Sequence, residues 1–138
     1  MIGKVKHGAI LHNCIDSTIQ QIEESGRYTV HLNRSASNFE EHVEIYKDLE
    51  KQGKLNKPWY EAVTLGSYHL PRFEWGDVCH AADISVFNNE NEVWISGDEI
   101  YKLIEPIKKE LGFKGGIGIG KRYIHFDVRD YEPKKWRY

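Results

Sequence analysis

Alternating apolar and polar side chains predict strands in three parts of the chain. In residues 27–33 (RYTVHLN), tyrosine, valine and leucine alternate with polar residues, which is the period of a half-buried strand. Residues 82–87 and 92–95 are expected to form two strands joined through a turn-prone pair of asparagines. Residues 115–131 (GGIGIGKRYIHFDVRDY) read as a glycine-rich approach to a further strand.

Apolar residues at helical spacing predict a helix soon after the first strand. Ser37 and Glu40 have the spacing of a capping box, and Gly53 supplies the end. Between them, apolar residues recur with the period of a helix at Phe39, Val43, Tyr46 and Leu49. A shorter helix is expected over residues 16–24, closed by a glycine, and a single helical turn near Trp59.

A second well-marked helix follows residues 92–95. Ser96 and Glu99 repeat the capping-box spacing, and Gly112 ends the segment. The apolar stripe between them consists of Ile100, Leu103, Ile104, Ile107 and Leu111. Pro106 lies inside this stripe and is expected to kink the helix or mark a break, because proline lacks the N–H that a helix needs.

The last predicted strand has one apolar and one polar face. Ile124, Phe126 and Val128 alternate with Tyr123, His125 and Asp127. Helices and mostly antiparallel strands in mixed order predict an α+β fold, in which a mostly antiparallel sheet is packed by helices. At 138 residues, the chain has the length of a small single domain, expected to span residues 1–138.

Composition adds few constraints on function. A hydrophobic share of 40% is ordinary for a folded protein, and a net charge of −2 gives no electrostatic case for a nucleic-acid partner. Cys14 and Cys79 are too few for a disulfide framework. The first twenty residues contain no long apolar run, so we expect no signal peptide and no membrane anchor. The low cysteine count favours synthesis in the cytoplasm. We also expect a monomer.

Residues 67–86 (SYHLPRFEWGDVCHAADISV) are rich in side chains that can bind metals. Asp83 begins an apolar strand, where a carboxylate is costly unless it is paired, hydrogen-bonded or bound to a cation. His125 and Asp127 project from the same face of the last strand. Two imidazoles and one carboxylate form a frequent catalytic zinc set. The alternative is that His69 is a surface or packing residue and that His125 belongs to a solvated sheet face.

The residues SYHL…HAADIS followed by GGIGIGKRYIHFDVRD resemble the M15-type metallopeptidases. This group comprises D-alanyl-D-alanine carboxypeptidases and cell-wall endopeptidases and shares its fold with the hedgehog signalling domain. The family pattern is S-x-H, then a short stretch ending in A-x-D, then a late strand carrying H-x-D or H-x-H-like residues. The resemblance covers roughly the second half of the chain. It implies that His69, Asp83 and His125 bind Zn²⁺ and that Ser67 and Tyr123 contact the substrate.

The resemblance also implies roles outside the metal ligands. Arg34, in VHLNRSASN, would hold a substrate carboxylate or carbonyl oxygen. Asp127 is a candidate catalytic base, although we favour a role in fixing the ring of a ligand histidine. Glu74 and Asp77 are the other candidate bases.

The chain departs from the family pattern in two ways. Arg122 and Tyr123 stand where related enzymes often carry their base. His69 and Asp83 are fourteen positions apart, about twice the family spacing, so residues 70–79 contain an insertion, and Cys79 replaces a common glycine. His80 and Cys79 are competing ligands that we rank behind His69.

These implications predict a peptidase that hydrolyses an amide bond in peptidoglycan stem peptides. A D-Ala-D-Ala carboxypeptidase or an L-Ala-D-Glu-type endopeptidase would fit, for example as a phage or prophage lysis enzyme. One alternative is a non-catalytic protein of the same fold that zinc stabilises. Another is a metal-free protein whose tryptophans, Trp59, Trp75, Trp94 and Trp136, pack or bind glycan.

Overall fold

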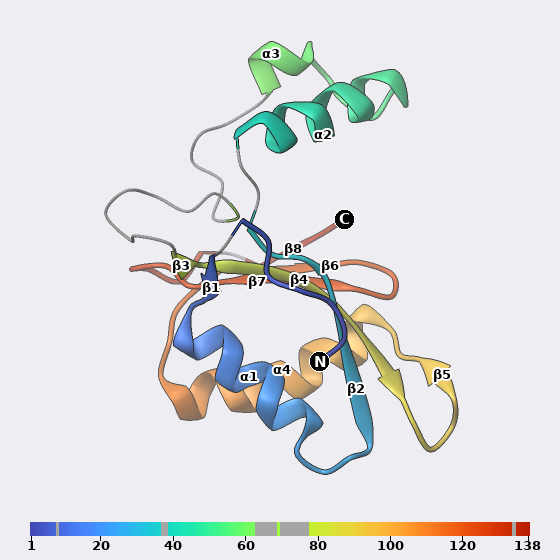
Figure 1. Ribbon diagram of the computed structural model, residues 1–138, viewed down its shortest axis with the longest axis vertical. Coiled ribbons are helices and arrows are strands. Elements are labelled where there is room, and N and C mark those ends of the chain that lie inside the picture. Colours follow the sequence, from blue (N-terminus) through green and yellow to red (C-terminus); the bar gives the residue numbers. More distant parts are fainter. Residues whose placement is uncertain (8, 37–38, 63–68, 70–77, 134) are drawn as a thin grey trace.

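The main sheet runs through the middle of the molecule (Figure 1). The computed structural model describes residues 1–7, 9–36, 39–62, 69, 78–133 and 135–138. The strands lie in the order β2 (Tyr28–Arg34), β4 (Ala81–Asn88), β7 (Ile124–Asp127), β6 (Ile117–Ile119) and β8 (Trp136–Arg137), and β5 (Val93–Trp94) pairs with β4. The pairings are antiparallel except that between β6 and β8.

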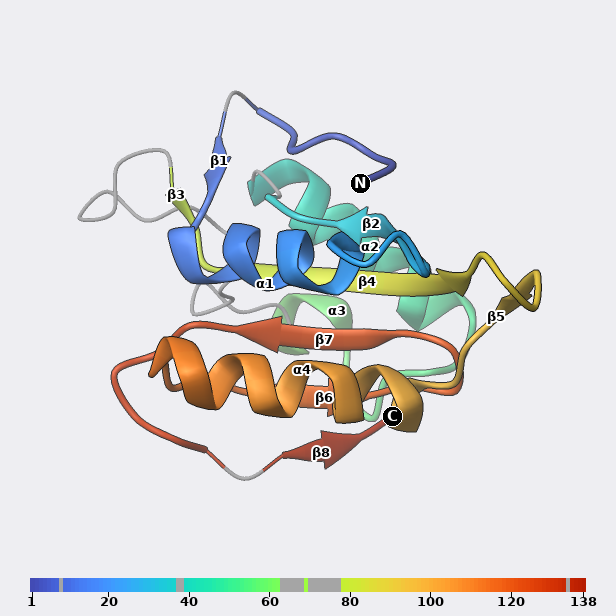
Figure 2. The ribbon, with the colours of Figure 1, turned by 90° about the horizontal axis from the view of Figure 1, so that it is seen from below.

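Helices lie on both sides of this sheet. α1 (Asn13–Glu23) and α4 (Gly97–Leu111) pack side by side against one face (Figure 2). α2 (Phe39–Lys51) and α3 (Trp59–Ala62) lie on the other side (Figure 1). β1 (Ile10–Leu11) and β3 (Val78–Cys79) form a small parallel pair at one end of the sheet. The predicted α+β fold with a mostly antiparallel sheet packed by helices is confirmed.

The hydrophobic core lies between the sheet and the helices α1 and α4. The strands β2, β4, β6 and β7 contribute alternate residues to this layer, and α1 and α4 each contribute one apolar stripe. The core includes Ile15, Ile19 and Ile22 from α1, Val30 from β2, Ile84 and Val86 from β4, Ile100 and Ile104 from α4, and Ile124 and Phe126 from β7. Because the apolar face of the sheet packs against this core, the polar side chains of its strands lie on the opposite face.

α4 has both predicted ends. The Ser96 hydroxyl accepts a hydrogen bond from the backbone N–H of Glu99 at 3.1 Å, and Gly112 closes the helix in the left-handed conformation. The expected break at Pro106 does not occur, since α4 is one helix from Gly97 to Leu111. Residues before and after the proline are buried against the same sheet, and this burial offsets the lost hydrogen bond.

Two other predictions were wrong, the start of α1 and the absence of a strand in the glycine-rich segment. α1 begins at Asn13, earlier than predicted, because the His12 ring accepts a hydrogen bond from the backbone N–H of Cys14 at 3.1 Å and caps the helix. The glycine-rich approach to the last strand contains β6, whose neighbours β7 and β8 supply its hydrogen-bonded partners. The predicted cap of α2 at Ser37 lies outside the described residues.

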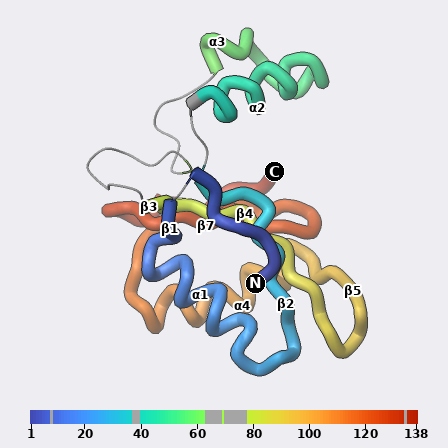
Figure 3. Tube along the Cα trace, in the orientation of Figure 1, coloured from blue at the N-terminus to red at the C-terminus, as the bar shows by residue number. Residues whose placement is uncertain are grey.

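The polar face of β7 is buried, which differs from the solvated alternative. His125 is 8% exposed and Asp127 is 1% exposed, so both faces of this strand are covered. The N-terminal residues return along β2, where Ile2 pairs with His31 (Figure 3). The covered polar face of the sheet is where the candidate site is built.

Candidate metal centre

Three neighbouring strands place their polar side chains in one row. Asp83 on β4 lies opposite His125 on β7 and, on its other side, opposite Arg34 on β2. Cross-strand partners in an antiparallel sheet have their Cβ atoms about 5 Å apart, so these side chains meet without help from any loop. The register of the sheet therefore assembles the centre of the site.

A β-bulge brings Arg34 into this row. Leu32 pairs with Ile84, but Arg34 pairs with Asp83, so Asn33 is the extra residue on β2. Strict alternation from the buried Leu32 would place Arg34 on the core side of the sheet. The bulge shifts the alternation by one residue, which is how bulges re-aim side chains near functional sites.

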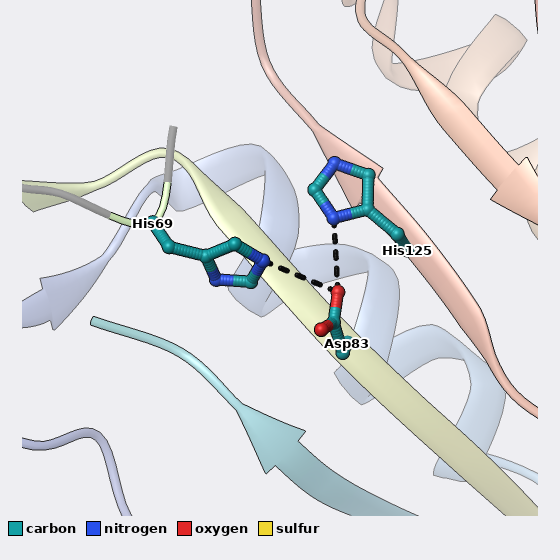
Figure 4. Close-up of side chains that lie close together, drawn as sticks. All are labelled: His69, Asp83 and His125. Atoms are coloured by element: carbon teal, nitrogen blue, oxygen red, sulfur yellow. Dashed lines mark hydrogen bonds and ion pairs between the residues drawn. The ribbon is translucent and has the colours of Figure 1, made fainter. Parts of the chain in front are cut away.

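His69 reaches the row from outside the sheet. Its Nδ1 lies 2.6 Å from the carbonyl oxygen of Ser35, and its Nε2 lies 3.2 Å from Oδ1 of Asp83. A carbonyl oxygen can only accept, so Nδ1 carries the hydrogen and donates it to Ser35. The Nε2 edge of the ring is thereby directed at Asp83 (Figure 4).

His125 approaches the same carboxylate oxygen from the opposite strand. Its Nδ1 lies 2.9 Å from Oδ1 of Asp83, and both rings point at this oxygen (Figure 4). One nitrogen from each histidine and one oxygen of Asp83 lie within 4.8 Å of one another. His69, Asp83 and His125 therefore form a largely buried group that could hold a metal ion.

The second nitrogen of His125 is also hydrogen-bonded. Nε2 lies 2.7 Å from Oδ2 of Asp127, whose carboxylate also accepts from the backbone N–H of Gly116 at 2.7 Å. Arg129 donates to both oxygens of Asp127, from Nε at 2.8 Å and from Nη2 at 3.0 Å. Asp127 is thus held on all sides, on the edge of His125 away from Asp83.

The protonation states of Asp83 and His125 depend on each other. Burial alone would raise the pKa of Asp83, but the hydrogen bonds from His125 and His69 hold that pKa well below its usual range. Burial would lower the pKa of His125, but its hydrogen bonds to Asp127 and Asp83 raise it instead. The carboxylates of Asp83 and Asp127 are therefore anionic, and they favour the positively charged form of the His125 ring.

This arrangement of donors and acceptors suits a cation. A neutral imidazole has a single N–H, so neutral His125 can donate to Asp127 or to Asp83 but not to both. When Nε2 donates to Asp127, Nδ1 presents a lone pair to the Asp83 oxygen, and Nε2 of neutral His69 does the same. These lone pairs repel one another, and a positive charge offsets that repulsion, either as a proton added to a ring or as a metal ion between the three residues.

A tryptophan covers the far side of His125. The Trp136 ring lies 5.4 Å from the His125 ring, measured between centroids. Gly118 is opposite His125 on one side and opposite Trp136 on the other, and a Cβ at this position would lie 2.4 Å from the indole nitrogen. Gly118 and Gly116 therefore leave room for the indole, whereas Gly120 leaves room for the Tyr123 ring.

The other predicted residues are placed as follows. Ser67, Glu74 and Asp77 lie outside the described residues. His80 packs its ring edge-on against His12, with centroids 4.8 Å apart. Cys79 is fully buried, and burial raises the pKa of its thiol, so it packs as a small apolar residue.

Tyr123 precedes β7, and its ring lies 5.4 Å from that of Tyr138. Burial and then the charge of Asp83 raise the pKa of Tyr123, so its phenol stays protonated at neutral pH. A protonated phenol can donate a hydrogen bond, which is the form that a substrate contact requires.

Several residues that support the site were not predicted from the sequence. Arg129 has the i+2 spacing from Asp127 that places both on one face of a strand, and this spacing was the available signal. No local sequence pattern indicated Trp136 or the carbonyl of Ser35, because their contacts depend on how distant segments of the chain pack.

A cavity of about 520 Å³ opens beside Arg34. Lys4, Lys6 and Glu41 also line it, as does Ser35, whose carbonyl holds His69. Among the described residues that line it, three are basic and one is acidic, and the acidic Glu41 is paired with His7 at 2.9 Å. An anionic group suits this cavity, which Arg34 and Ser35 connect to the group formed by His69, Asp83 and His125.

No helix in the described part of the chain is long and apolar enough to cross a membrane. Comparison of the chain with protein-family models, with curated proteins and with solved structures finds no match.

Proposed function

We propose that His69, Asp83 and His125 bind Zn²⁺ and that the protein is a zinc-dependent peptidase acting on peptidoglycan stem peptides. The observation that carries the proposal is the convergence of these three residues, which are far apart in the sequence, on one site. They are the residues that the M15-type resemblance implies as ligands. Two histidines and one carboxylate leave a fourth tetrahedral position for water or substrate, as catalytic zinc sites do.

The ligand set favours zinc over the harder cations. Calcium and magnesium prefer six or more oxygen ligands, whereas this group offers two imidazole nitrogens and a carboxylate. The carboxylate that supports His125 also matches zinc sites, in which a ligand histidine donates its other N–H to a carboxylate or a carbonyl. His69 has the same kind of support from Ser35.

The peptidase chemistry assigns distinct roles to the neighbouring groups. When bound, zinc lowers the pKa of a water molecule and polarises a carbonyl group. Tyr123, protonated at neutral pH, donates a hydrogen bond to the substrate. Asp127 does not serve as the base, because its oxygens already accept hydrogen bonds from His125, Arg129 and Gly116. The catalytic base is therefore assigned to neither Tyr123 nor Asp127.

Arg34 is assigned to an anionic or carbonyl group of the substrate, since it lies beside Asp83 and lines the basic cavity. We expect Arg34→Gln to lower kcat/KM by roughly 10–100-fold, because a hydrogen bond to a charged group contributes about 1.5–3 kcal/mol. Steady-state kinetics on a peptide with a free carboxylate measures this effect. The control is Arg27→Gln, an exposed arginine paired with Glu90, which should leave kcat/KM unchanged. Equal kinetics for the two variants would contradict the assignment of Arg34.

A second function stays in consideration, a non-catalytic protein that zinc stabilises. It is favoured by Arg122 and Tyr123, which stand where related enzymes often carry their base. Metal analysis of the purified protein combined with digestion of muropeptides of several types separates the two functions. Stoichiometric zinc with release of a peptide fragment or of D-alanine supports the peptidase. Zinc without cleavage supports the second function, and absence of zinc contradicts both.

A further inference from the structure

We propose that Arg129 is a positioning residue that makes Nδ1 of His125 the metal-binding nitrogen. The inference rests on the proposed metal site. Arg129 does not reach the metal ligands Asp83 or His69 in any described contact, and it acts through Asp127. Its role is to fix which edge of the His125 ring carries the hydrogen.

The contacts of Asp127 are the first support. Arg129 donates two hydrogen bonds in the bidentate geometry that suits a guanidinium and a carboxylate, one to each oxygen. The backbone N–H of Gly116 adds a third donor to Oδ1. A carboxylate held by three N–H groups keeps a fixed orientation. Its Oδ2 is therefore an acceptor aimed at Nε2 of His125.

The consequence for His125 follows from the count of hydrogens. A neutral ring that donates from Nε2 to Asp127 has no hydrogen on Nδ1, so the lone pair of Nδ1 faces Asp83 and the ligand group. The opposite tautomer would place a hydrogen on Nδ1, where a metal ion would otherwise bind, and would leave a lone pair facing a carboxylate. Arg129 disfavours this tautomer by holding the acceptor in place.

The packing around Arg129 is the second support, and it is independent of the hydrogen bonds. The guanidinium lies 5.9 Å from the centroid of the Trp136 ring, and that ring lies against His125. A Cβ at Gly116 would come within 3.0 Å of Nη2 of Arg129, so a glycine at this position makes room for the guanidinium. Trp136 and the space above Gly116 therefore accommodate the Arg129 guanidinium beside Asp127.

The test compares zinc affinity in four proteins by competition with a chromogenic chelator. Arg129→Gln is expected to weaken zinc binding by roughly 10–100-fold, the usual effect of losing a group that supports a metal ligand. Arg129→Lys keeps the charge but lacks the bidentate geometry, so its loss is expected to be smaller. Arg137→Gln is the matched control, because Arg137 is an exposed arginine of the same C-terminal segment and pairs with Asp98. It should bind zinc like the wild type.

A second readout reports the ring itself. Long-range ¹H–¹⁵N spectra of the zinc-saturated wild type should show the His125 hydrogen on Nε2, slowly exchanging with water. In Arg129→Gln this hydrogen should exchange at least about tenfold faster, because its acceptor is no longer held. The spectra are recorded at saturating zinc, where the folded state of each variant is favoured by the bound metal.

The outcomes distinguish the inference from the proposed function. If the wild type binds no zinc, the proposed function fails and the inference fails with it. If the wild type binds zinc and Arg129→Gln equals it in affinity and in ¹⁵N signature, the inference alone is overturned. Weaker binding and faster exchange in Arg129→Gln, with an unchanged Arg137→Gln, support it.

Discussion

Replacing His125 with alanine is expected to abolish stoichiometric zinc binding and any peptide hydrolysis. In structural zinc sites four ligands share a binding energy of about 10–16 kcal/mol, so we expect one ligand of the proposed site to contribute roughly 2.5–4 kcal/mol. Its loss weakens affinity on the order of 100- to 1,000-fold. Metal analysis after dialysis and muropeptide digestion measure the two effects.

The control for this variant is His31→Ala. His31 lies on β2 opposite Ser85 and packs against Trp94, with ring centroids 4.6 Å apart, and it is not part of the ligand group. It should retain zinc and activity. Retention of one zinc per chain by His125→Ala would contradict the assignment of His125 as a ligand.

Removal of zinc by a chelator is expected to lower the melting temperature substantially. A ligand present at 1,000 times its Kd stabilises the folded state by about 4 kcal/mol, provided that it does not bind the unfolded chain. For a chain of this length, 1 kcal/mol corresponds to about 3–4 °C, so the expected shift is roughly 12–16 °C. Differential scanning calorimetry with and without a chelator measures it.

Asp83→Asn provides the matched comparison for this experiment. The substitution keeps the size of the side chain but removes the charge that both histidines approach. Its melting temperature should not depend on the chelator. A chelator shift of the same size in the wild type and in Asp83→Asn would show that the stabilising ion binds elsewhere.

Much of the sheet and of the helix positions could be predicted from the sequence, because the core uses simple periodic patterns. The helix between Ser96 and Gly112 has its cap, its apolar stripe and its glycine stop in the expected places. The strand containing Ile124 and Phe126 has the expected alternation. These elements depend on neighbouring residues, which is the information that local patterns carry.

The elements that were missed depend on partners far away in the chain. β1 and β3 consist of two residues each and exist only because they pair with each other. β6 contains a glycine at its centre, which weakens a strand signal, and the reason for that glycine is Trp136. The bulge at Asn33 has no local signal either, although it decides the face on which Arg34 lies.

The candidate site was predicted in part. The grouping of His69, Asp83 and His125 is confirmed as a group that could hold a metal ion, and the identity of zinc stays a proposal. The supporting Arg129 was missed, because an arginine after a strand is usually solvated. The role of Asp127 followed from its place on the face of His125, and its contacts agree with the supporting role that we favoured.

The anchoring of His69 has a consequence for how this site can vary. Each nitrogen of its ring is held by a residue outside the connection that leads to Asp83, one by Ser35 and the other by Asp83 itself. The position of the ring is thus set from both ends, and the number of residues between the two ligands is free to change. A connection of a different length is compatible with the same two contacts of the ring. Substitutions and insertions within that connection are therefore expected to leave the His69 ring in place.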